Sequence, residues 1–311
     1  MQSTTYTQAV LDSHLVLRRQ LKWLAVETVL LAVCFYRPLL DLLDFTLHDK
    51  LFSYIPLIPL ISAYLIWTDR KKFTTEVCPS RIGAALAFCA GAGVVLLWWL
   101  GTRAGWEIES QDYIALMTLS FLCFFWGACL ALPGWKILRD AAFPIAFLIF
   151  AVPMPSAWVD GIETFFQYTS AFAAEMFFAV ARTSCLRDGL QLNLPGFSLI
   201  VAPECSGIHS TLVLFITSLL AAYMFLRSAS SRLILALSIL PLAILRNGFR
   251  IFVIGELCVH VSPTMIDSPI HRKGGPIFFA LSLIPLFLLL VFLRKRDFNE
   301  LKGFPKQARL K

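Results

Sequence analysis

Long apolar runs are the feature of this sequence that most restricts its fold. A helix of about 20 residues crosses the hydrocarbon core of a bilayer, and several apolar runs here are of that length. The mean hydropathy is +0.73 and only 15% of residues are charged, which is far more apolar than a soluble domain of this size. The runs lack two-residue alternation, so helices rather than barrel strands are expected. The sequence therefore predicts an all-α polytopic membrane protein.

Eight of these runs are assigned as transmembrane helices. They are 22–36, 51–67, 82–100, 113–132, 141–153, 206–226, 233–258 and 276–293. Lysine and arginine gather in the N-terminal segment, in the second, fourth and sixth connections and in the C-terminal tail, whereas connections 37–50 and 101–112 are net acidic. Because basic connections stay in the cytoplasm, both termini are predicted to be cytoplasmic. The net charge of +7 then reflects orientation rather than a nucleic-acid-binding surface.

The same count places residues 154–205 on the outer side of the membrane. A helical stretch after Pro155 has the length of a ninth span, but it contains Asp160, Glu163 and Glu175, which are poorly placed in lipid. Spanning would also move the basic tail outside. We therefore expect an interfacial helix here.

The next stretch, RDGLQLNLPGFSLIVAP, alternates short β-prone runs with Gly189, Pro195 and Gly196. This pattern predicts a small β-hairpin before the sixth span. We divide the chain into an N-terminal transmembrane scaffold of four spans (1–140), a catalytic membrane core (141–295) and a basic cytoplasmic tail (296–311).

The motif PECSGIHS, residues 203–210, places a thiol where the chain enters the sixth span. The partial positive charge of a helix N-terminus favours a thiolate at Cys205, and the small Ser206 and Gly207 leave access to the sulfur. The adjacent Glu204 would raise the thiol pKa unless a cation balances it, and it has two other possible roles, as an arginine partner or as a helix cap. The alternative is a buried structural cysteine.

The motif RNGFR, residues 246–250, places two arginines inside the seventh span. A central arginine costs on the order of 3 kcal/mol on insertion scales. Arg246 and Arg250 share a helix face and need partners or a water-filled cavity, and Asn247 adds an amide beside them. A structural alternative is neutralisation by Glu256 or Glu204, or snorkelling to the surface.

Histidines near the outer side complete the set of reactive groups. His271, in HRKGG before the last span, is a candidate base near neutral pH. Its rivals are His209, one helical turn from Cys205, and His260 at the outer end of the seventh span. Thiol, arginine and histidine at one depth predict thiol acyl transfer, in which Cys205 attacks a peptide carbonyl, histidine moves protons and arginine stabilises the oxyanion.

These motifs, in this order, resemble the exosortase/archaeosortase family over residues 141–295. The resemblance implies a cysteine transpeptidase of the cytoplasmic (inner) membrane that faces the periplasm. Such enzymes occur alongside exopolysaccharide and biofilm genes in Gram-negative bacteria, and they process exported proteins with a C-terminal signal made of a Pro-Glu-Pro-like (PEP-CTERM) motif, a transmembrane helix and a basic tail. The resemblance matches the family's nucleophile to Cys205, its arginine in the pattern Asn-x-x-Arg to Arg250, and its histidine to His271. It leaves His209 and Arg246 outside the family's core pattern.

The implied partners are the transmembrane sorting signal, membrane lipid and an acceptor nucleophile that the sequence does not identify, which is an amine, a lipid or water. The proposed chemistry requires no metal or organic cofactor, and the eight cysteines contain no CxxC pair. One alternative is a transporter or channel component in which Arg246, Arg250 and Glu256 line an anion path. Another is an O-antigen or lipid acyltransferase. A disulfide between Cys185 and Cys258, both predicted on the oxidising side, stays open.

Overall fold

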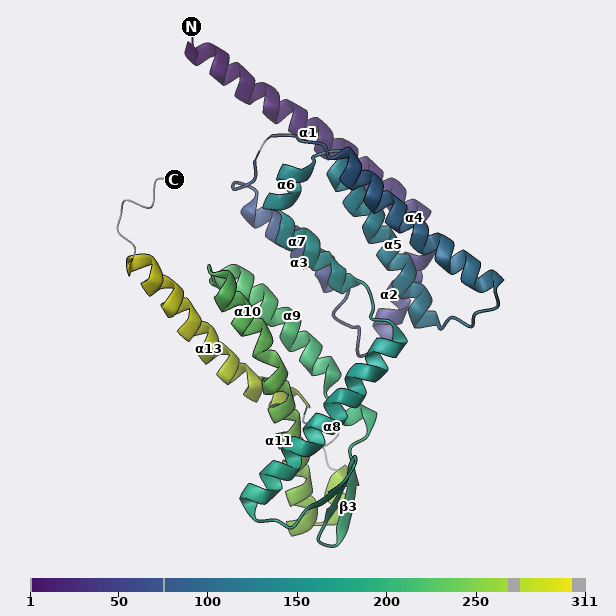
Figure 1. Cartoon of the computed structure of the whole chain (residues 1–311), viewed down its shortest axis with the longest axis vertical. Coiled ribbons are helices and arrows are strands. Elements are labelled where there is room, and N and C mark those ends of the chain that lie inside the picture. The colour runs from purple at the N-terminus through teal and green to yellow at the C-terminus, as the bar shows by residue number, and fades with distance from the viewer. Residues whose placement is uncertain (1, 75, 268–274, 304–311) are drawn as a thin grey trace. The chain divides into compact units, whose positions relative to one another are not determined.

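The computed structural model describes residues 2–74, 76–267 and 275–303. Helices dominate, and the chain forms two compact units, residues 1–156 and 157–311 (Figure 1). Each unit has its own buried residues and is described by itself.

The first unit is built from helices joined by short connections. They are α1 (Gln2–Cys34), α2 (Tyr36–His48), α3 (Leu57–Asp69), α4 (Arg81–Arg103), α5 (Ser110–Ala131), α6 (Trp135–Asp140), α7 (Ala142–Phe147) and the 3₁₀ turn η1 (Leu148–Ala151). The helices α4 and α5 form its most extensive pair. Glycine permits this close packing, because a Cβ on Gly127 would lie 2.7 Å from the Phe88 ring.

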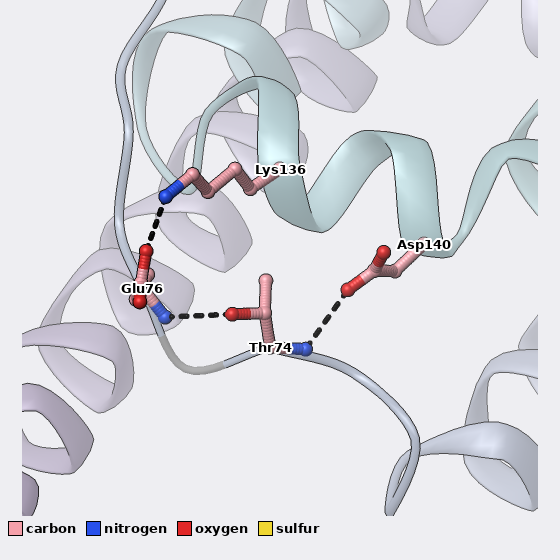
Figure 2. A network of polar contacts seen from close by, with 4 residues as sticks. All are labelled: Thr74, Glu76, Lys136 and Asp140. Atoms are coloured by element: carbon pink, nitrogen blue, oxygen red, sulfur yellow. Dashed lines mark hydrogen bonds and ion pairs between the residues drawn. The ribbon is translucent and has the colours of Figure 1, made fainter. Parts of the chain in front are cut away.

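Polar contacts join two connections of the first unit (Figure 2). The backbone N–H of Thr74 donates to Asp140 Oδ2 at 2.9 Å, and Lys136 pairs with Glu76. Beside them, Gly134 adopts a φ of +89°, and a Cβ there would overlap the Cys78 carbonyl. The contacts bring the second and fourth predicted connections together, and the side of the membrane on which they lie stays a prediction.

The second unit combines helices with a small sheet. Its elements are α8 (Ser156–Ala181), β1 (Leu186–Asp188), β2 (Gln191–Leu194), β3 (Phe197–Ile200), the 3₁₀ turn η2 (Pro203–Cys205), α9 (Ile208–Phe225), α10 (Ala229–Leu237), α11 (Ile239–His260), η3 (Pro263–Asp267) and α13 (Gly275–Gly303).

The predicted strand pair is present as β2 and β3, and β1 extends it to an antiparallel sheet of order β1-β2-β3. Leu192 pairs with both Arg187 and Leu199 in the register. The connecting turns use Gly189 and Gly196, whose φ values of +61° and +76° favour glycine.

The sheet, α8 and α11 share one hydrophobic core. Ala174, Phe178, Leu192 and Ile251 are among its buried members. The helices approach closely because α11 carries Gly248 where it meets α8. A Cβ on this glycine would lie 2.5 Å from the Ala173 Cβ. The core therefore holds the strand-to-helix segment that carries Cys205 against α11.

Five single helices of the described residues are long and apolar enough to cross a membrane, and up to seven spans result if each bent pair counts as one. The five are Arg81–Arg103, Ser110–Ala131, Ile208–Phe225, Ala229–His260 and Gly275–Asn299. They correspond to the third, fourth, sixth, seventh and eighth predicted spans. The predicted total of eight is not confirmed.

Proline explains where the remaining predicted spans deviate. The first ends at Cys34, because Pro38 cannot donate to the Cys34 carbonyl, and the chain bends by 75° into α2. The second is helical only from Leu57, directly after Pro56, and is too short to span alone. The fifth consists of α7 and η1, each only a few residues long, and ends at Ala151, just before Pro153 and Pro155. A helix is present where the interfacial helix was predicted, as α8, and its position at the interface stays a prediction.

Candidate active site

The residues before α9 form a tight turn that presents Cys205. The backbone N–H of Cys205 donates to the Ala202 carbonyl at 2.8 Å, and that of Ser206 donates to the Pro203 carbonyl at 2.9 Å. Gly207 follows with a φ of +74°, a left-handed conformation that suits glycine, and α9 begins at Ile208. Cys205 therefore lies at the entry to the helix, as the sequence predicted, and a short turn separates it from Ile208. The electric field of a helix N-terminus falls off within about one turn. At Cys205 the field of α9 acts across the short turn that separates the thiol from the helix.

Asn247 holds this turn from α11. Its Nδ2 donates to the Cys205 carbonyl at 2.6 Å, to the Ser206 carbonyl at 3.1 Å and to Ser170 Oγ on α8 at 3.0 Å. The side chain is buried, with only 2% of its surface exposed. A buried carbonyl without a donor costs about 1–3 kcal/mol, so one amide satisfies two carbonyls that would otherwise be costly. Asn247 thus fixes the backbone on both sides of the Cys205–Ser206 bond.

Arg246 of α11 also contacts this turn. Its Nη2 donates to the Gly207 carbonyl at 3.3 Å and to Thr211 Oγ1 at 3.1 Å. The residue is 8% exposed, and its Nη1 has no hydrogen-bond partner among the described residues. The sequence placed Arg246 outside the core pattern, yet the structure gives it direct contact with the turn that carries the thiol.

Glu256 does not neutralise these arginines, contrary to the structural alternative that the sequence left open. Its two carboxylate oxygens bond Thr183 Oγ1 at 2.6 Å and His260 Nε2 at 3.0 Å. Glu256 lies towards the C-terminal end of α11, where it ties the end of α8 to α11. The other suggested partner, Glu204, lies in the described turn, but its side chain is outside the described part of the structure.

Cys205 and Arg250 line one small cavity. Its other walls are apolar residues of β3, the segment after it and α11, namely Leu199, Ile200, Val201, Ile251 and Ile254. The cavity volume is about 10 Å³, which is room for about one water molecule. Both side chains are partly exposed. A thiol and a guanidinium from different elements therefore face one space with little room for solvent.

Of the three candidate histidines, two lie among the described residues. His271 lies outside the described residues. Among those described, His209 is exposed on α9, and His260 is exposed and engaged with Glu256. The described lining of the cavity contains neither of them. The roles of the three histidines stay predictions.

Two polar residues of α8 belong to the site although the sequence did not single them out. Gln167 is buried, and its Nε2 donates to the Val201 carbonyl at 3.0 Å, which fixes the chain just before the cysteine turn. Ser170, also buried, accepts from Asn247. Their signal in the sequence was their position in an otherwise apolar run, FFQYTSAF, where a polar residue needs a partner.

The thiols and acidic groups near the site form no metal centre in the described parts of the chain, where no group of three or more potential ligands comes together. Cys185 and Cys258 form no disulfide in the structure. Among the described residues, the polar groups that contact the cysteine turn include the Arg246 guanidinium and the amides of Asn247 and Gln167.

A comparison with known families decides the classification of the chain. Residues 46–288 match the family model described as transmembrane exosortase (Exosortase_EpsH). The chain belongs to the transmembrane exosortase family. The exosortase match begins well before residue 141, so most of the N-terminal unit is part of the family region and not only a generic hydrophobic scaffold. No curated protein and no solved structure matches the chain significantly.

Proposed function

We propose that this exosortase-family protein is a membrane-embedded cysteine transpeptidase or endopeptidase. Its substrates are exported proteins that carry a PEP-CTERM-like C-terminal sorting signal. Membership of the family, which in general comprises cysteine transpeptidases acting on such signals, supports this proposal. The single observation that carries it is the cavity lined by both Cys205 and Arg250.

The reaction begins with the Cys205 thiolate attacking the carbonyl carbon of the scissile peptide bond. The carbonyl electrons move to oxygen, and the Arg250 guanidinium, on the same cavity, stabilises that negative charge. The oxyanion then collapses, the C–N bond breaks, and the amine of the sorting signal leaves with a proton donated by His271. A thioester between Cys205 and the exported protein remains. An amine or a water molecule attacks the thioester and gives up a proton to the histidine, and the C–S bond breaks to restore the Cys205 thiolate.

The start of α13 packs against α11. The Phe278 ring of α13 lies 6.3 Å from the Phe249 ring of α11. His271 lies outside the described residues, and its role in this proposal rests on its match to the histidine of the family.

Immobile backbone around the nucleophile would serve this chemistry. Asn247, Arg246 and Gln167 hold the turn through three separate backbone contacts, to Cys205, Gly207 and Val201. A nucleophile fixed near its target avoids part of the entropic cost of the reaction. In this proposal these three are positioning residues, while Cys205, Arg250 and His271 touch the substrate.

The proposed setting is the inner membrane, with both termini in the cytoplasm and the cavity facing the periplasm. The transmembrane helix of the sorting signal would dock against the apolar helices, with its cleavage motif at the outer interface. Lipid surrounds the enzyme and its substrate anchor.

The test is co-expression with a candidate sorting-signal protein from the same genome. Cys205→Ser, Arg250→Ala and His271→Ala are expected to abolish processing, followed as a mass shift of the substrate. Cys185→Ser is the matched control, since Cys185 packs against the same core but does not line the cavity. Processing by Cys205→Ser at the wild-type rate would refute the proposal and favour the transporter interpretation. Processing of a substrate without its C-terminal helix would favour a lipid acyltransferase.

A further inference from the structure

A basic pocket lies at the end of the second unit where α9, α10 and α13 meet. These three helices pack on one another (Figure 1). The pocket has a volume of about 750 Å³. The charged residues that line it are Arg227, Arg232, Arg294, Lys295 and Asp297. Its walls therefore carry four cations and one carboxylate among the described residues.

The single carboxylate offsets only one of the four positive charges, and its oxygens accept from neutral donors of the fold. Asp297 is 5% exposed. Its Oδ2 accepts from the backbone N–H groups of Arg227 and Ser228 at 2.8 and 3.1 Å, and its Oδ1 accepts from the hydroxyls of Ser228 and Ser231 at 3.0 and 2.6 Å. An ionised carboxyl offers about four lone-pair sites. Asp297 thus fixes the wall of the pocket and leaves its interior strongly positive.

Two of the cations are oriented by their neighbours. The Arg232 guanidinium donates to the Leu226 carbonyl through Nε and Nη2, at 3.1 and 2.9 Å, and lies 5.7 Å from the centre of the Tyr223 ring. The Arg294 guanidinium lies 6.0 Å from the centre of the Phe225 ring. Both remain exposed. These contacts orient the two guanidinium groups and leave their other N–H groups able to donate to a ligand.

The pocket is at the boundary of the apolar segments. The apolar run of α13 ends at Leu293 and the charges begin at Arg294, while α9 ends at Phe225, two residues before Arg227. Tyr223 is an aromatic side chain of the kind that marks the membrane–water interface. The depth is therefore that of lipid headgroups, and basic pockets between transmembrane helices are suited to anionic headgroups.

We propose that this pocket binds the phosphate-bearing headgroup of an anionic phospholipid. The phosphodiester accepts from the guanidinium groups of Arg232 and Arg294, the remaining cations neutralise further charge, and the acyl chains extend along the apolar faces of α9 and α13. The site is separate from the cavity of Cys205 and Arg250, with no residue in common.

The test measures lipid binding by the purified full chain in detergent, by native mass spectrometry. The probes are phosphatidylglycerol, phosphatidylcholine and inorganic phosphate. Each basic group near an anionic headgroup contributes about 1 kcal/mol, so Arg232→Gln and Arg294→Gln are each expected to weaken phosphatidylglycerol binding by about fivefold. Arg294→Gln breaks no hydrogen bond of the fold that the structure shows, so it remains informative if Arg232→Gln fails to fold.

Arg70→Gln is the matched control. Arg70 is likewise exposed, donates to a backbone carbonyl (Trp67, 2.8 Å) and lies 4.5 Å from an aromatic ring centre, but it belongs to the first unit. It is expected to bind phosphatidylglycerol as the wild type does. Three results would each overturn the proposal: equal binding by wild type and Arg294→Gln, equal affinity for phosphatidylcholine, or displacement of the lipid by equimolar inorganic phosphate, which would indicate a free-phosphate site.

Discussion

Replacing Gly207 by alanine tests whether the cysteine turn is held as described. Two separate costs follow from the structure. Gly207 has a φ of +74°, and an L-residue pays about 1–2 kcal/mol in the left-handed region. Its new Cβ would also lie 3.0 Å from Asn247 Oδ1 and 3.3 Å from Arg246 Nη2. Both neighbours are buried, so the overpacking adds about 1 kcal/mol or more. The variant is expected to lose about 2–3 kcal/mol of its free energy of unfolding.

Gly196→Ala separates the two costs. Gly196 has nearly the same φ, +76°, but a Cβ there would meet nothing within 4 Å. This control is expected to lose only the backbone share, about 1–2 kcal/mol. The assay is the free energy of unfolding in detergent titrated with SDS, combined with peptide mass spectrometry of the rate at which iodoacetamide alkylates Cys205. Gly207→Ala should be the less stable variant and should alone change the Cys205 rate. Equal stability and an unchanged rate in both would refute the described contacts of the turn.

Three further outcomes are expected. Asn247→Ala removes the amide that donates to the Cys205 and Ser206 carbonyls and to Ser170 Oγ, so the free energy of unfolding should fall by about 1–3 kcal/mol. A free energy of unfolding equal to that of the wild type would contradict these contacts. Gly248→Ala should separate α8 from α11, because its Cβ would lie 2.5 Å from the Ala173 Cβ, and the unfolding free energy should fall by about 1–3 kcal/mol. Burial, and secondarily the charge of Glu175, raise the pKa of the Cys185 thiol. Its thiolate fraction near neutral pH is thus reduced, and its alkylation should rise with pH at values above those of an unfolded-chain thiol; coincident pH profiles in folded and SDS-unfolded protein would contradict this.

Much of the architecture was predictable because the bilayer imposes a length and a composition. The runs 82–100 and 113–132 contain no proline and form single long helices, α4 and α5. The strand pair before the sixth span was predictable from Gly189 and Gly196, which the turns require. Hydropathy alone assigned the first and second spans, and there the backbone chemistry of Pro38 and Pro56 decided where the helices end and begin.

The reactive groups of the candidate site were predictable from the sequence, but the contacts that hold them in place were not. Cys205 and Arg250 were identified from their chemistry and their motifs, and they share a cavity. The roles of Arg246, Gln167 and Ser170 depend on which helix face meets which turn, and this is set by the close contact of α8 with α11. Contacts between segments so distant in the sequence cannot be obtained from the local pattern of one chain.

The most direct test of the central claim is the detection of an acyl-enzyme at Cys205. The full chain is co-expressed with a sorting-signal substrate, stopped in acid, and digested for mass spectrometry, with and without hydroxylamine. The account predicts a substrate-derived acyl group on the Cys205 peptide that hydroxylamine removes and that is absent from Cys205→Ala. Full processing of the substrate by Cys205→Ala, with no adduct on any cysteine of the wild type, would contradict it.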